Sequence, residues 1–200
     1  MIEKYDIRDI RDRAQGVSPG GVLPDEVEYA RRMLRERREP ITAGLYVIGY
    51  CGNPDDAELL EQFLLGEEND AYADVALICL CRHLGLVNRY RGLIGQLIIS
   101  GASDDIRRSA AIQLCKEYFI ECRDDVLGCR LVEILCDSLD ADQSIARAAL
   151  VEILKLHGRL ISPYIIKGVL WDEDDKLILE ESIKYFNCGT AKLQHVMRLS

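Results

Sequence analysis

The sequence DDIRRSAAIQLCKEYF, residues 104–119, decides the fold of this chain. Ile106 is followed four positions later by Ala110, and large apolar residues continue the same stripe, which is the periodicity of an amphipathic α-helix. Three further segments align with it: DAYADVALICLCRHLG from residue 70, QSIARAALVEILKLHG from residue 143 and DKLILEESIKYF from residue 175. The equivalent small residues are Ala76, Ala110, Ala149 and Ser182, spaced by 34, 39 and 33 positions. The sequence therefore predicts an internal repeat.

A second apolar helix precedes each aligned segment. These earlier helices are predicted at residues 25–37, 56–66, 87–101, 125–139 and 161–171, and residues 39–52 add one more later helix. The unit is therefore helix, short turn, helix, repeated five times. Glycine adopts the left-handed C-cap conformation without strain, and the glycines predicted to end helices are Gly66, Gly85, Gly101, Gly158 and Gly189. Asp70, Asp104 and Asp142 are predicted near the starts of the later helices, as caps.

The pattern in residues 104–111, DDIRRSAA, resembles the HEAT-repeat signature, an acidic turn followed by apolar-Arg-x-x-Ala. Residues 144–149 are similar but carry Ala146 at the arginine position, and Ala73 stands there in the preceding repeat. The resemblance covers residues 25–190. It implies an all-α fold, a right-handed α-α superhelix of the HEAT/ARM-like solenoid type with about five helical hairpins.

The two ends of the chain differ from the repeats between them. Residues 1–24 are predicted to form an N-terminal capping helix, at residues 2–14, followed by a Gly- and Pro-rich linker. The repeats occupy residues 25–190. Residues 191–200 are predicted to form a C-terminal capping helix.

Composition excludes several classes of protein. The chain has 200 residues, 48% hydrophobic and 30% charged, which is too apolar for disorder, and it has no apolar run long enough to span a membrane. Its net charge of −9 argues against binding nucleic acid or an anionic membrane. No signal-peptide pattern opens the sequence, so a cytoplasmic location is expected. The eight cysteines are expected to be reduced, most of them packed as small apolar residues.

The acidic residues concentrate in the turns between the helices of each repeat. The turns at 66–70, 101–105, 137–142 and 172–175 carry twelve acids and no lysine or arginine. Capping accounts for about one acid per turn, and the excess predicts an acidic ridge that attracts a basic partner protein. The predicted partner-binding residues are Glu67, Glu68, Asp70, Asp74, Asp104, Asp105, Asp140, Asp142, Asp172, Glu173, Asp174 and Asp175.

Charged residues also lie on two other predicted surfaces. The later helices present mixed charge at positions predicted to face outward, among them Arg108, Arg147 and Lys155, and this concave face is the alternative binding surface. Five arginines lie within residues 31–38, but residues 1–40 hold equal numbers of acids and bases. A salt-bridged exposed helix is therefore the favoured interpretation of the arginines, and contact with a phosphate or an acidic protein is the alternative.

Motifs for catalysis are lacking. The phosphate-binding loop, the dinucleotide fingerprint and the nucleophile elbow are absent from the sequence. Cys79 and His83 stand at i and i+4, but zinc needs two further ligands, so Cys79 is predicted to pack in the core and His83 to lie at its rim. No catalytic residue, metal or cofactor is predicted.

The predicted function is that of a non-catalytic protein-binding module. Its small size, its acidity and the family resemblance suit an immunity protein that blocks a basic toxin, such as a nuclease, through the acidic ridge or the concave face. The alternatives are an adaptor or assembly factor and, from a different class, a HEAT-like lyase-type enzyme.

Overall fold

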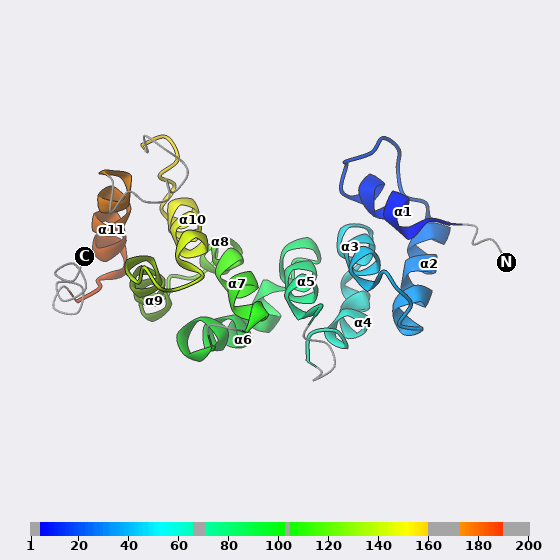
Figure 1. The fold of residues 1–200 in the computed structure, drawn as a ribbon, viewed down its shortest axis with the longest axis horizontal. Coiled ribbons are helices and arrows are strands. Elements are labelled where there is room, and N and C mark those ends of the chain that lie inside the picture. Colours follow the sequence, from blue (N-terminus) through cyan, green and yellow to red (C-terminus); the bar gives the residue numbers. More distant parts are fainter. Residues whose placement is uncertain (1–4, 66–70, 103–104, 160–172, 190–200) are drawn as a thin grey trace. The chain divides into compact units, whose positions relative to one another are not determined.

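The computed structural model describes residues 5–65, 71–102, 105–159 and 173–189, and all the regular elements in them are helices (Figure 1). The chain divides into two compact units, Met1–Tyr90 and Arg91–Ser200. The prediction of an all-α protein built from packed helix pairs is therefore confirmed. The predicted helices at 161–171 and 191–200 lie outside the described residues.

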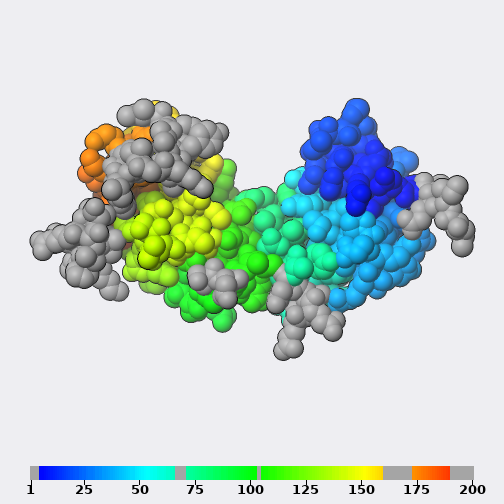
Figure 2. All heavy atoms as spheres, in the orientation of Figure 1, coloured from blue at the N-terminus to red at the C-terminus, as the bar shows by residue number. Residues whose placement is uncertain are grey.

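Unit 1 is built around one apolar helix. Its elements are α1 (Ile7–Ala14), α2 (Pro24–Arg35), α3 (Ile41–Cys51), the 3₁₀ turn η1 (Pro54–Asp56), α4 (Ala57–Glu61), α5 (Ala73–Ile78), the π-helical turn η3 (Cys79–His83) and the start of α6 (Val87–Ser100). Helix α3 packs against α1, α2, α5 and η3, and Leu45, Val47 and Ile48 on it are fully buried. The atoms of α1, α2 and α3 form the blue part of Figure 2.

Unit 2 continues from α6 and has two central helices. Its elements are α7 (Ile106–Gln113), α8 (Cys115–Phe119), α9 (Asp125–Cys136), α10 (Gln143–Leu154) and α11 (Glu173–Phe186). Helix α9 packs against α10 and α11, while α10 also packs against α7, α8 and α11. Ala110 and Ala149, two of the small residues that define the repeat, are buried, which lets the helices approach closely.

The helix ends differ in part from the predictions. Helix α6 ends at Ser100 before Gly101, as predicted. Helices α10 and α11 end sooner than predicted, because Lys155 (φ 55°) and Asn187 (φ 53°) already adopt the left-handed conformation expected of Gly158 and Gly189. At helix starts, Asp105 caps α7 through its side chain. Asp142 precedes α10 but its carboxylate makes no capping bond, because it is engaged elsewhere, as described below.

No helix in the described ranges is both long enough and apolar enough to cross a bilayer.

Candidate protein-binding sites

The acidic residues predicted to bind a partner have different environments. Glu67, Glu68, Asp70, Asp104 and Asp172 lie outside the described residues. Asp74 belongs to unit 1 and is half-buried. Asp105, Asp140, Asp142, Glu173, Asp174 and Asp175 belong to unit 2.

Asp140 and Asp142 bind an arginine inside unit 2. The Arg108 residue is 1% exposed, and its guanidinium donates to both carboxylate oxygens of Asp140, at 2.9 and 2.7 Å, and to Asp142 at 2.7 Å. The hydroxyl of Ser109 donates to the second oxygen of Asp142. These bonds tie the start of α7 to the turn before α10. The Arg108 guanidinium also holds the pKa of Asp140 below its usual range.

A second buried arginine has a similar role one helix pair later. Arg147 on α10 is 2% exposed and donates to Asp175 on α11 at 2.7 Å. Asp174 beside it is 3% exposed. The prediction that Arg108 and Arg147 face outward is therefore wrong. The carboxylates that bind each arginine lie about one repeat later in the sequence. Residues one repeat apart meet because the later helices of successive repeats start side by side.

These contacts show how the fold of unit 2 uses the acids that the sequence predicts to bind a partner. Asp142 and Asp174 are buried, Asp140 accepts from Arg108 with both oxygens, and Asp175 accepts from Arg147 with one. Asp105 caps α7 and pairs with Arg107, which lowers its pKa. Glu173 alone among the six residues in unit 2 is exposed, and it pairs with Lys176. The sequence pattern of these acids indicates capping and solvent exposure, but it does not indicate pairing with buried arginines about one repeat earlier.

The arginine cluster of the first repeat is salt-bridged, as the sequence indicated. Arg31 donates to Asp56, at 2.7 and 2.9 Å, and to Glu28. Arg35 also pairs with Glu28. These arginines neutralise carboxylates of their own unit.

Unit 2 contains an open cavity of about 530 Å³ between α9 and the end of α11. The residues that line it are Ile99, Asp125, Val126, Cys129, Arg130, Glu133, Phe186, Asn187, Cys188 and Gly189. Val126 is 69% exposed and Ile99 48% exposed, so two large apolar side chains face solvent at this cavity. Sequence periodicity assigned both to helices but did not indicate that they lie at one hollow.

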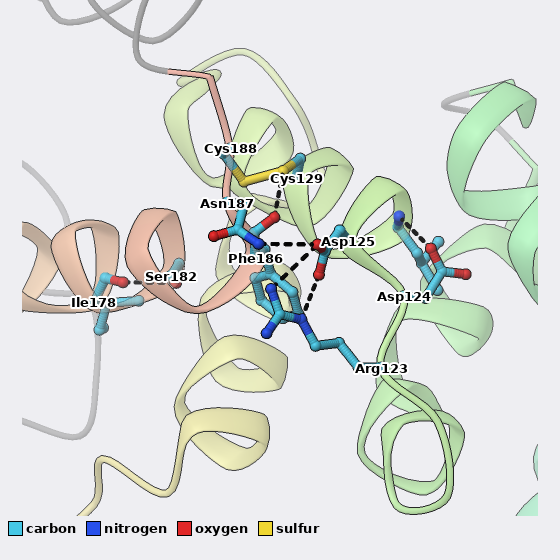
Figure 3. The surroundings of a disulfide bond; sticks show 10 residues. Arg123, Asp124, Asp125, Cys129, Ile178, Ser182, Phe186, Asn187 and Cys188 are labelled. Atoms are coloured by element: carbon cyan, nitrogen blue, oxygen red, sulfur yellow. Dashed lines mark hydrogen bonds and ion pairs between the residues drawn. A yellow bond between two sulfur atoms is a disulfide. The ribbon is translucent and has the colours of Figure 1, made fainter.

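The polar groups at the cavity are held in place by one another. Arg123 pairs with the carboxylate of Asp125, and the side-chain amide of Asn187 donates to the same carboxylate at 3.3 Å (Figure 3). The Arg123 guanidinium lowers the pKa of Asp125. Arg130 pairs with Glu133 at 3.0 Å. An apolar hollow with a fixed polar rim is a common form of ligand and protein docking site.

A disulfide between Cys129 and Cys188 forms one wall of the cavity (Figure 3). The expectation that all eight cysteines are reduced is wrong for this pair. Their Cα atoms lie 5.5 Å apart although the two residues are 59 positions apart in the sequence. Only the packing of the end of α11 on α9 brings them together, so their spacing in the sequence gave no sign of the bond.

The bond lies beside a close helix contact. Phe186 is fully buried and packs against Gly128, where an added Cβ would lie 2.1 Å from the ring. The centroid of the Phe119 ring on α8 lies 5.4 Å from the centroid of the Phe186 ring. The end of α11 is therefore anchored by its aromatic side chain as well as by sulfur.

The candidate metal pair has the environment predicted from the sequence. Cys79 is fully buried, and burial raises the pKa of its thiol to about 12, whereas His83 is half-exposed and lies against the ring of Tyr50, 4.0 Å between centroids. Cys79 in the core and His83 at its rim are thus confirmed. In the ranges that the structure describes, no three His, Cys, Asp or Glu side chains are grouped to hold a metal ion.

Comparisons of the chain with protein-family models, with curated proteins and with solved structures give no match.

Proposed function

We propose that this chain is a non-catalytic protein-binding module that docks a partner at the cavity between α9 and α11. The observation that carries the proposal is the exposure of Val126 and Ile99 at an apolar hollow bounded by Asp125, Arg130 and Glu133. Exposed apolar side chains gathered at a hollow with a polar rim are typical of docking sites for proteins and ligands. Covering the Val126 side chain with a partner would contribute about 1–2 kcal/mol.

The proposed partner is a basic protein. The chain carries a net charge of −9, which speeds the approach of a positively charged surface and makes binding sensitive to salt. The net charge attracts a basic partner over about a Debye length. The acids that bind Arg108 and Arg147 can therefore contribute to this attraction without touching the partner.

The finer proposal is an immunity or inhibitor protein of the HEAT-like solenoid type that blocks a basic toxin, such as a nuclease. The packed helix pairs, the recurring small residues and the acidic charge support it. A nuclease must have a positive groove for its substrate, and an acidic protein can compete for such a groove.

The test compares two aspartate substitutions at exposed apolar positions. Val126→Asp places a charge at the cavity, whereas Leu139→Asp changes a residue that is 92% exposed and outside the cavity. We expect the unaltered chain and Leu139→Asp to retain the same basic protein from an extract of the source cells, and Val126→Asp to lose it. With that protein purified, a desolvation cost of about 2 kcal/mol corresponds to roughly 30-fold weaker binding. Equal binding by both variants would exclude the cavity as the docking site.

The nature of the retained protein distinguishes the alternatives. Inhibition of a toxic activity, with growth restored by the unaltered chain and not by Val126→Asp, supports an immunity function. Retention of a multisubunit complex without any toxic activity supports an adaptor or assembly factor. Turnover of a chromophore attached to the retained protein would support a lyase-type enzyme and refute a non-catalytic role.

A further inference from the structure

The Cys129–Cys188 disulfide is accessible from the cavity. Cys129 is half-exposed on α9, Cys188 is 7% exposed just after α11, and both residues line the open hollow. A thiol that enters the cavity can therefore reach the bond from the Cys129 side.

The other cysteines in the described part of unit 2 contrast with this pair. Cys115 and Cys136 are buried, and burial raises the pKa of both thiols, that of Cys136 to about 11. A higher pKa leaves less of the reactive thiolate, so these thiols are poor nucleophiles. Cys122 is an exposed free thiol and lies outside the cavity lining. Among the described cysteines, the combination of a disulfide and an open cavity is found only at Cys129 and Cys188.

The fold around the bond does not depend on sulfur alone. Phe186 is fully buried against Gly128, and α11 packs along α9. When the bond opens, these contacts still hold α11 to α9. Asn187, Cys188 and Gly189 lose their covalent tie and keep the 3.3 Å hydrogen bond from Asn187 to Asp125. Opening the bond therefore changes one wall of the cavity and leaves the core of the unit in place.

We propose that Cys129–Cys188 is an exchangeable disulfide, a site at which a small thiol or a protein thiol reacts within the cavity. The thiolate of the incoming thiol attacks Sγ of Cys129 and forms a mixed disulfide; the Cys129–Cys188 bond breaks, and Cys188 leaves as a thiolate that takes a proton from water. A second thiol then attacks the mixed disulfide and releases Cys129. Two thiols are oxidised to one disulfide, and the protein disulfide is reduced to two thiols.

This inference goes beyond the proposed function, although it concerns the same cavity. Its test needs no partner protein, so the two proposals can fail separately. The test uses the full chain with Cys122→Ser, which removes the exposed thiol that would otherwise react first. The folded protein is equilibrated with mixtures of reduced and oxidised dithiothreitol, blocked with N-ethylmaleimide, and mapped by peptide mass spectrometry.

We expect residues 129 and 188 to be cross-linked and unlabelled without reductant, and to become labelled together in the folded protein as the mixture turns reducing. Cys115 and Cys136 should be labelled only after denaturant is added. Adding Cys188→Ser frees Cys129, which should then form a mixed disulfide with oxidised glutathione. The matched control is Cys136→Ser, on the same helix and outside the cavity lining, which should leave the disulfide intact.

Three results would overturn the inference. Labelling of Cys129 and Cys188 without reductant would show that the bond is absent. Resistance to reductant until the protein unfolds would show that the bond is structural and inaccessible. Failure of Cys129 to react with oxidised glutathione in the Cys188→Ser protein would show that thiols do not enter the cavity. Hydrogen exchange gives a further check, because the amides of residues 187–189 should exchange faster after reduction while those of α10 stay unchanged.

Discussion

Arg108 offers the most direct test of how unit 2 is held together. It is 1% exposed and binds two carboxylates from the turn before α10, so Arg108→Met leaves Asp140 and Asp142 close together without a cation. Breaking a buried ion pair from one side costs about 3–5 kcal/mol. For a chain of this length each kcal/mol lowers Tm by about 2–4 °C, so we expect a loss of roughly 6–20 °C.

The neighbouring arginine supplies a matched control. Arg107 pairs with Asp105 two residues away, and its side chain is 32% exposed. Arg107→Met should therefore cost less than about 1 kcal/mol. Thermal unfolding followed by circular dichroism compares the two variants under the same conditions. Adding Asp140→Asn and Asp142→Asn to Arg108→Met should restore most of the lost stability. The two neutral amides do not repel each other as the two carboxylates do.

The loss should also depend on pH. The pKa of Asp140 is lowered in the folded protein, mainly by its hydrogen bonds to Arg108. A group with a lowered folded pKa stabilises the fold above its unfolded pKa, near 3.9, and this stabilisation disappears as pH falls through the folded pKa. The difference between the unaltered chain and Arg108→Met should therefore be largest near neutral pH and shrink below about pH 4. If Arg108→Met is no less stable than Arg107→Met at neutral pH, the assigned role of Arg108 is wrong.

Four further substitutions, one of them a control, test local packing and helix ends by chemical denaturation. Gly128→Ala should destabilise the protein by about 1–3 kcal/mol, because the new Cβ would overlap Phe186. The control is Gly95→Ala on α6, where the space around the glycine is open, and it should stabilise the protein by up to about 1 kcal/mol. A loss of stability in Gly95→Ala equal to that in Gly128→Ala would contradict the close contact. Asp105→Ala should lower the free energy of unfolding by about 1 kcal/mol at neutral pH, because it removes the cap of α7. The pKa of Asp105 is lowered in the folded protein, so this loss of stability should vanish in acid. A loss that does not depend on pH would refute the cap. Lys155→Gly should stabilise the protein by up to about 1 kcal/mol, because glycine adopts the left-handed backbone conformation at the end of α10 without strain. A loss of stability would argue against that conformation.

Local features of the fold could be predicted from the sequence. The 3.6-residue periodicity located α2, α3, α6, α9, α10 and α11 to within a few residues. The small residues Ala110 and Ala149 were correctly expected at close helix contacts. These features follow from the side chains of one helix, so neighbouring residues in the chain suffice to predict them.

Features of the candidate site depended on residues far apart in the chain. Arg108 is polar and sits on a helix, so the sequence favours solvent exposure; only the turn before α10 supplies the carboxylates that make its burial possible. Cys129 and Cys188 likewise meet only where the end of α11 packs on α9, beside the contact of Phe186 with Gly128. Helical periodicity shows which face of a helix is apolar, but it does not show which distant helix covers that face. The ion pairs, the disulfide and the cavity were therefore decided by tertiary packing, whereas the helices and the net charge were already determined by the order and kind of the amino acids.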